Sequence, residues 1–301
     1  MSEPVAAIDC GTNTVRLLIS QDGRDLVRRA VVTGIGVGVA ASKRFNDDAV
    51  TRTLEVLREY KELLDQHQVE KLRVVATQAA REAKNRQQFF DQIENILGQA
   101  PELLSGEEEG ELTFIGATAD FDRTRGPFCV IDLGGGSTEF AIGTDKLEAV
   151  MSTEMGSVRF TEAYIEHDPP WATELYNCIS LVEAHTSDVL REMPQILDAA
   201  TFIGVAGTIT TMASVELGSS VDDREITHHL ELTREAAEDV YRNLVVEPLA
   251  DRIHNPGLPV ERAEVIVAGA TILVAIMRNL SMSSIVVSEH DLLDGLIASL
   301  A

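Results

Sequence analysis

The stretch VIDLGGGSTEF, residues 130–140, places an aspartate at the end of an apolar run and follows it with three glycines, a serine and a threonine. A loop with so few side chains exposes several backbone N–H groups, and such groups bind anions. Asp132 alone would repel a phosphate held there. Its position is explained if it holds a hydrated Mg²⁺, which needs only one or two carboxylates and accepts phosphate oxygens as further ligands.

A second stretch has the same frame. AAIDCGTNTVRLLI, residues 6–19, again gives an apolar strand, Ile-Asp-x-Gly, a polar turn and a second strand. Asp9 and Asp132 are 123 residues apart, close to one domain length, which indicates a duplicated domain rather than a solenoid. A third turn, VAGTIT at 205–210, enters a helix, whose N-terminus also attracts anions. One such turn is usually a plain hairpin, whereas the three together favour phosphate binding.

The loops require two α/β domains to position them. The polar segment 120–127 predicts the boundary, with one domain over 1–124 and another over 125–301, whose last helix could pack back on the first. Apolar periodicity predicts strands within 5–11, 14–20, 25–36, 71–78, 102–105, 126–143, 146–157, 200–205 and 284–288, and helices over 48–66, 85–98, about 172–197, 233–246, 259–280 and 291–300.

Composition narrows the partners. A formal net charge of −24 argues against nucleic acid, so any phosphate must be held by local amides, arginines and metal. The longest apolar run, 265–277, is shorter than the roughly 18 residues of a membrane span, and no leader is evident. Three scattered cysteines fit a reduced cytoplasmic protein, and Cys10 and Cys129 are expected to be small buried hydrophobic residues.

Taken together, the motifs resemble those of the exopolyphosphatase / guanosine pentaphosphate phosphohydrolase (Ppx/GppA) family, of the actin-like ATPase superfamily. The resemblance covers almost the whole chain, and in extent the chain is similar to the shorter members of the family. Its motifs are AIDCGTNTVRLLI, ATQAAREAKN, LLSGEEEGELTF, VIDLGGGSTEF, EMGSVRFTE, GVAGTITTMA, PGLPVERAEVIVAGATIL and SEHDLLDGL. It implies two ribonuclease-H-like domains around an active-site cleft.

The resemblance also implies roles for individual residues. Glu109 falls on the catalytic carboxylate that activates water. Asp132 matches the metal-associated aspartate and Glu139 the second acid of that motif, with Asp9 as its counterpart in the first repeat. The residues matched to substrate phosphates are Gly11, Thr12, Asn13, Arg81, Gly134, Gly135, Gly136, Ser137, Thr138, Ser157, Gly207 and Thr208. Without the resemblance, EEEGE would read as a solvated helix start.

Four features stand apart from this assignment. Gly110 and Glu111 follow the catalytic position where many relatives have Ala-Arg, and Asp294 stands where positive charge is common. His228 and His229 are adjacent, so in a strand they would point to opposite faces and could not share one metal. His254 and His290 are expected to have simple polar roles.

The implied activity is metal-dependent hydrolysis of terminal phosphate from inorganic polyphosphate, with 5′-phosphate hydrolysis of pppGpp as the alternative. Mg²⁺ is the expected cofactor, with Mn²⁺ as a substitute and a monovalent cation as an open requirement. A homodimer is expected, and neither a membrane nor a nucleic acid polymer as partner. A small-molecule kinase and a non-catalytic actin-like binding protein are the rival functions; 301 residues leave little room for a kinase's insertions, and the matched cleft residues argue against the second.

Overall fold

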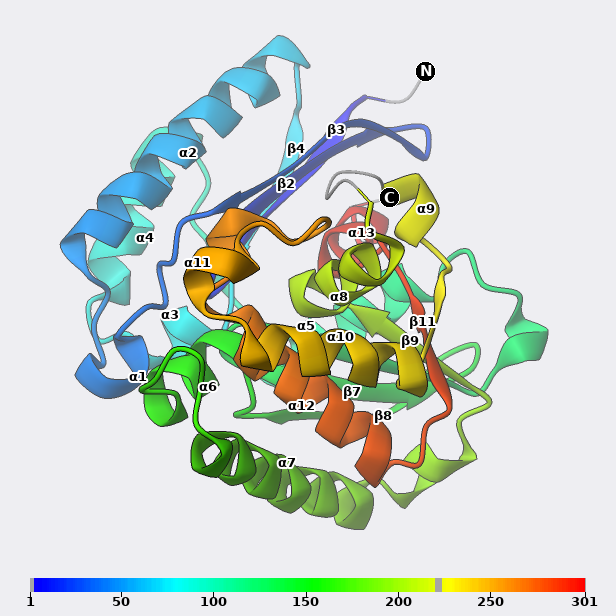
Figure 1. The fold of residues 1–301 in the computed structure, drawn as a ribbon. Helices are drawn as coiled ribbons and strands as arrows, with labels where there is room; N and C mark the ends of the chain where they lie inside the picture. Colours follow the sequence, from blue (N-terminus) through cyan, green and yellow to red (C-terminus); the bar gives the residue numbers. More distant parts are fainter. Residues whose placement is uncertain (1–2, 220–223, 301) are drawn as a thin grey trace. The chain divides into compact units, whose positions relative to one another are not determined.

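The computed structural model describes residues 3–219 and 224–300 and divides the chain into two compact units. The first contains residues 1–116 and 292–301, and the second contains residues 117–291. Each unit is built around one sheet, so the predicted two-domain α/β fold class is confirmed. Figure 1 shows the elements of both units.

The first sheet has the strand order β3-β2-β1-β4-β5. β2 is antiparallel to β1 and β3, while β1, β4 and β5 run parallel, which is the ribonuclease-H-like arrangement. Its strands are β1 (Val5–Cys10), β2 (Thr14–Gln21), β3 (Arg24–Val32), β4 (Lys71–Ala76) and β5 (Glu102–Leu103). The helices of this unit are α1 (Val39–Ser42), α2 (Asp47–Gln66), α3 (Gln78–Glu82), α4 (Arg86–Leu97), α5 (Gly106–Ala117) and α13 (Leu292–Ala298).

The second sheet has the order β10-β11-β9-β6-β7-β8 and repeats this pattern, with one strand added at its edge. Its strands are β6 (Phe128–Leu133), β7 (Thr138–Gly143), β8 (Leu147–Thr153), β9 (Thr201–Val205), β10 (Glu231–Thr233) and β11 (Ser284–Val287). The helices are α6 (Ser157–Tyr164), α7 (Ala172–Glu192), α8 (Gly207–Leu217), α9 (Arg224–Thr227), α10 (Arg234–Val246), α11 (Leu249–Arg252) and α12 (Ile266–Asn279). Short 3₁₀ turns cover η1 (Arg123–Arg125), η2 (Pro194–Asp198) and η3 (Val260–Arg262).

The core of the first unit has two sides, because successive residues of β1 point to opposite faces. Ala6 and Ile8 pack with the buried faces of α2 and α4, whereas Ala7 packs with Leu104 and the leucines of α13. In the second unit, α12 is buried along its length and lies against α6, α7 and α10 (Figure 1). The prediction that 265–277 is a core helix is therefore confirmed.

Some element boundaries differ from those predicted. The helix expected over 172–197 ends at Glu192, because Pro194 cannot continue it and begins a 3₁₀ turn. The helix expected over 259–280 begins only at Ile266, after Pro259 and another 3₁₀ turn. Among the described residues, no helix combines the length and hydropathy of a membrane span.

The three cysteines are free and buried, which confirms the prediction for Cys10 and Cys129. Burial raises the pKa of the thiols of Cys10 and Cys129 far above the usual range, and it raises the pKa of Cys178 to about 11. All three therefore stay protonated near neutral pH and act as small apolar side chains.

Candidate active site

The two predicted hairpin loops have the same local geometry. Each is a four-residue connection between antiparallel strands, closing on the pair Cys10–Val15 in one sheet and Leu133–Thr138 in the other. The N–H of Gly11 donates to the carbonyl of Thr14 at 3.1 Å, and the N–H of Gly134 donates to Ser137 at 3.0 Å. The repeat predicted from the sequence is thus present in the fold.

The second loop turns its amides away from α6. The carbonyls of Gly134 and Gly135 accept hydrogen bonds from the first N–H groups of α6, at 2.9–3.1 Å, and the carbonyl of Gly136 accepts from Arg159 Nε at 2.8 Å. In a trans peptide the C=O and the following N–H point in opposite directions. The amides of Gly135, Gly136 and Ser137 therefore face away from α6, which is the arrangement of an anion nest.

The third predicted turn begins α8 beside an arginine that the sequence analysis did not single out. A Cβ on Gly207 would lie 1.8 Å from Nη1 of Arg262, so only glycine lets the guanidinium approach this helix N-terminus. A Cβ on Gly269 would lie 2.7 Å from the Thr208 hydroxyl and 3.3 Å from Cβ of Ser157. Thr208 and Ser157 are thus close together. A single arginine in a helical segment gave no signal from which its position could be found.

Thr138, predicted among the phosphate contacts, has a different hydrogen bond. Its hydroxyl donates to the carbonyl of Met155 at 2.6 Å, and the side chain is fully buried. A hydroxyl has one proton to donate, so in this structure that proton is committed to the backbone. The hydroxyl of Ser157 lies 3.4 Å from the Gly134 carbonyl, a longer contact.

The aspartates of the two hairpins face different kinds of side chain on the neighbouring strand, an acid in one case and an arginine in the other. Asp132 and Glu139 are directly opposite each other in β6 and β7, so their buried side chains share one face of the sheet. In the first hairpin, the residue directly opposite Asp9 is Arg16. Its Nε and Nη2 donate to Asp9 Oδ2 at 2.9 and 2.7 Å. Glu139 Oε1 accepts a hydrogen bond from Ser152 at 2.7 Å.

This difference bears on where a divalent cation fits. Two buried carboxylates side by side repel each other, and an ion of Mg²⁺ type would offset that repulsion with the oxygen ligands it prefers. Asp132 and Glu139 fit this description. Asp9, which the sequence grouped with these two, is paired with Arg16 through Oδ2, and its role at a metal stays a prediction.

In the first unit, the parallel strands β1, β4 and β5 bring the remaining predicted residues to one edge of the sheet. Gly11, Thr12 and Asn13 follow β1, Arg81 follows β4 in α3, and Glu109 follows β5 in the first turn of α5. Because the strands are parallel neighbours, their carboxyl ends meet there. The backbone carbonyls of Thr12 and Asn13 accept hydrogen bonds from the segment 33–36, which fixes the first loop.

Glu109 differs from its glutamate neighbours in burial. Glu107, Glu108 and Glu111 are exposed, whereas Glu109 is 9% exposed. Arg81 Nη1 donates to Glu109 Oε2 at 2.9 Å and to the Leu104 carbonyl at 2.8 Å. Gln78 Oε1 holds the opposite edge of the guanidinium at 2.6 and 2.9 Å. The carboxylate is therefore oriented by a clamped arginine.

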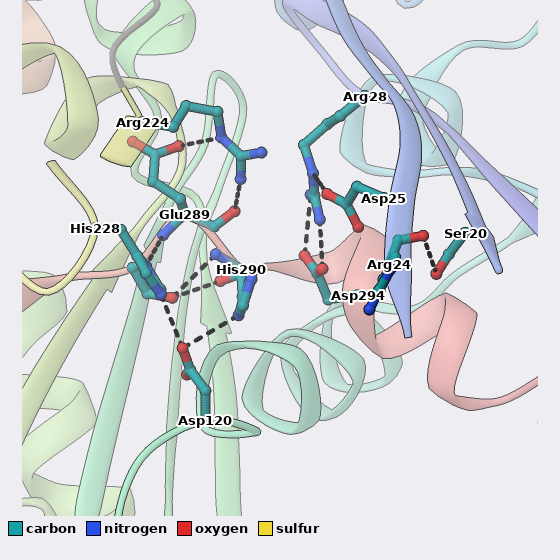
Figure 2. Close-up of polar contacts among 11 residues, drawn as sticks. Ser20, Arg24, Asp25, Arg28, Asp120, Arg224, His228, Glu289, His290 and Asp294 are labelled. Carbon is teal, nitrogen blue, oxygen red and sulfur yellow. Dashed lines mark hydrogen bonds and ion pairs between the residues drawn. The ribbon is translucent and has the colours of Figure 1, made fainter. Parts of the chain in front are cut away.

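The unusual Asp294 on α13 is paired within the first unit. Arg28 of β3 donates to both carboxylate oxygens of Asp294, and its Nε donates to Asp25 at 2.7 Å (Figure 2). The negative charge is thus balanced locally. Gly110 and Glu111 are the other positions where many relatives have different residues. Gly110 is buried and Glu111 is exposed, so this difference adds an acid to the surface.

The expectation that His228 and His229 point apart is wrong. They form the turn after α9 rather than part of a strand, and His229 has a left-handed backbone with φ of 63°. Their rings stack with centroids 4.0 Å apart, and both Nε2 atoms face Asp120. The simple alternation of a strand does not apply to a turn of this kind.

Comparison with known proteins gives consistent findings. A model of the Ppx/GppA phosphatase family matches residues 20–301. Exopolyphosphatase 2 of Mycobacterium tuberculosis is 37% identical, over 99% of this chain and 98% of that protein. The crystal structure of an exopolyphosphatase-like protein is 35% identical, with a TM-score of 0.95, covering 99% of this chain and 98% of the other. An exopolyphosphatase from Cytophaga hutchinsonii is 25% identical, with a TM-score of 0.88, over 99% and 97% of the two chains.

Proposed function

Since the chain belongs to the Ppx/GppA phosphatase family, we propose that it is an exopolyphosphatase, a phosphoanhydride hydrolase that removes the terminal phosphate of inorganic polyphosphate. The observation that carries the proposal is the Gly134–Ser137 loop, whose amides turn away from α6 beside two buried acids. The full-length similarity to a protein named exopolyphosphatase supports the choice of substrate.

Phosphate is held by neutral hydrogen-bond donors and a few cations, and not by the electrostatic field of the protein's net charge. With a net charge of −24 the protein repels a polyanion at long range, so binding depends on contacts at the site. Within the second unit, the candidate phosphate contacts are the loop amides, the Ser137, Ser157 and Thr208 side chains and Arg262. Within the first unit, the predicted ones are the Gly11–Asn13 loop and Arg81. The cleft predicted between the two domains stays a prediction.

Asp132 and Glu139 would hold Mg²⁺, with Mn²⁺ as a substitute. When bound, the ion supplies charge neutralisation for phosphate oxygens. Asp9, which the sequence grouped with these acids, pairs with Arg16 and so keeps the first hairpin electrically balanced. Its predicted role in metal binding stays a prediction.

Glu109 acts as the general base. Arg81 fixes the carboxylate through Oε2, and a carboxylate so fixed can orient a water molecule and take its proton. The water oxygen forms a bond to the terminal phosphorus while the bridging P–O bond breaks. The shortened polyphosphate leaves with the electrons of that bond.

The experiment is a phosphate-release assay on the purified full-length chain with Mg²⁺ and polyphosphate of short and long chain length. Glu109→Gln is expected to lower kcat by about 10²–10⁴-fold, the range of a lost general base. Glu107→Gln, in the same turn but exposed, is the matched control and is expected to keep the wild-type rate. No release from either polyphosphate, or a fully active Glu109→Gln, would contradict the proposal.

Hydrolysis of pppGpp is the second activity to measure in the same assay. No observation favours it over polyphosphate, and the ratio of the two kcat/KM values decides the balance. The homodimer, the monovalent cation and the cytoplasmic location stay predictions of the sequence.

A further inference from the structure

A second polar cluster lies in the second unit and shares no residue with the site assigned above. It consists of Asp120, in the segment after α5, of His228 and His229, in the turn after α9, and of His290, after β11. We call these four residues the Asp120 cluster. Figure 2 shows the imidazoles of His228 and His290 directed at the Asp120 carboxylate.

The three imidazoles converge on one oxygen. Asp120 Oδ2 lies 2.8 Å from His228 Nε2, 3.2 Å from His229 Nε2 and 3.5 Å from His290 Nδ1. The ligand atoms of Asp120, His228 and His229 all lie within 4.8 Å of one another. The four side chains are 23–40% exposed, so the cluster is open to small solutes.

Two of these separations match a metal site better than a hydrogen bond, whereas the 2.8 Å from Asp120 Oδ2 to His228 Nε2 is an ordinary hydrogen bond that an ion would replace. An ion with tetrahedral bonds of about 2.0–2.2 Å separates its ligand atoms by about 3.3–3.6 Å. The His229 and His290 contacts, at 3.2 and 3.5 Å, lie at or beyond the long end of ordinary hydrogen bonds. Several imidazoles with one carboxylate form a donor set that suits Zn²⁺ and related ions, whereas Mg²⁺ prefers oxygen alone.

We propose that Asp120, His228 and His229 bind a divalent transition-metal ion of the zinc class, with His290 in reach as a fourth ligand. The ion would join three segments that are far apart in sequence, since Asp120 and His228 are separated by 108 positions. This site shares no residue with the Asp132 and Glu139 pair and differs from it in donor chemistry.

The protonation of the cluster agrees with this assignment. Burial and the neighbouring His228 lower the pKa of His229, which favours the neutral imidazole that metals require. Burial opposes ionisation of Asp120, but the hydrogen bonds from His228 and His290 outweigh it and hold the pKa of Asp120 well below its usual range.

Binding through His228 has a specific structural consequence. The N–H of Glu289 donates to His228 Nδ1 at 3.1 Å, so in the metal-free protein the His228 proton is on Nε2. A metal at Nε2 moves that proton to Nδ1, and the Glu289 amide then loses its acceptor. Glu289 is otherwise held by Arg224 and Thr227, so its amide reports the change directly.

The experiment is a Zn²⁺ titration by calorimetry on the full chain, stripped with a chelator and kept in millimolar Mg²⁺. We expect one Zn²⁺ per chain with a micromolar or lower Kd, and Co²⁺ should give the visible absorption of a tetrahedral site. Asp120→Asn and His229→Ala should each weaken binding at least 10-fold. His185→Ala, on α7 outside the cluster, should bind as the wild type does.

A second readout separates a lost ligand from a lost fold. Circular dichroism should be the same for all variants, and Zn²⁺ should raise the Tm of the wild type but not that of His229→Ala. Zn²⁺ should also speed hydrogen exchange of the Glu289 amide. If the wild type binds no Zn²⁺, or if Asp120→Asn and His229→Ala both bind as tightly as it does, the cluster is a hydrogen-bonded lock and the proposal is overturned.

Discussion

At the scale of single residues, one position distinguishes the two hairpins of the repeat. Arg16 stands opposite Asp9, whereas Glu139 stands opposite Asp132. The same backbone thus carries an ion pair in one unit and a pair of acids in the other. Of these two described hairpins, the one in the second unit has the carboxylate pair that suits a divalent cation.

This difference predicts the effect of Glu139→Gln on the metal requirement. Removing one of two ligands should raise the Mg²⁺ concentration for half-maximal polyphosphate hydrolysis by about 10-fold or more. Mg²⁺ titrations of initial rate at fixed polyphosphate measure it. Glu148→Gln, exposed on β8 of the same sheet, is the control. An unchanged requirement in Glu139→Gln would place the ion elsewhere.

The sequence located the loops but could not choose among the glutamates. The repeated Ile-Asp-x-Gly motif can be recognised directly in the sequence, because the geometry of a hairpin loop depends on the few residues that form it. Glu109 is distinguished only by its burial against Arg81, which comes from a different helix, and no period within EEEGE encodes that contact. The resemblance to a family, rather than the residues alone, selected it.

At the scale of elements, the start of α5 explains why the glutamates next to Glu109 differ from it. The Ser105 hydroxyl accepts from the Glu108 N–H at 3.1 Å, and the Glu108 carboxylate accepts from the Ser105 N–H at 2.8 Å. This capping box satisfies two backbone donors and fixes the first turn. Glu108 therefore positions the helix that carries the proposed base.

Glu108→Ala should lower the free energy of unfolding by about 0.5–1 kcal/mol at pH 7, the net value of one hydrogen bond. The Ser105 N–H lowers the pKa of Glu108, so this contribution is present above the ordinary glutamate pKa of about 4.3 and is lost as pH falls through the lowered value. Urea unfolding followed by circular dichroism at pH 7 and pH 3 measures both. Glu107→Ala is the control, and a difference that persists at pH 3 would contradict the capping role.

Element boundaries were predictable where a strong local signal exists. Gly98 has the left-handed backbone at the end of α4, as its position predicted. The turn at His228 and His229 was not predictable, because a left-handed histidine is uncommon and the partner of both side chains, Asp120, is distant in sequence. Tertiary contacts of this kind are absent from any local pattern.

At the scale of the whole molecule, the last helix completes the core of the first unit. Leu292, Leu293 and Leu296 are almost fully buried against Ala7, Leu18, Val75 and Leu104. Arg28 and Asp294 add an ion pair beside this core. The first sheet therefore has one face covered by α2 and α4 and the other covered in part by residues from the far end of the chain.

Leu296→Ala should accordingly destabilise the protein by about 2–5 kcal/mol, the range for a fully buried leucine. Leu26→Ala, at a position 42% exposed on β3, should cost far less and serves as the control. Denaturant unfolding by circular dichroism compares them. Equal stabilities of the two variants would show that α13 adds little to the first unit.

The chain enters the second unit once, after residue 116, and leaves it once, before residue 292. The second unit is thus an insertion within the first. A ribosome makes the chain from the N-terminus, so all 175 residues of the insertion, 117–291, have been synthesised before α13 exists. The first unit is therefore completed after the second, because the leucines of α13 that pack on Ala7, Leu18 and Val75 are synthesised last.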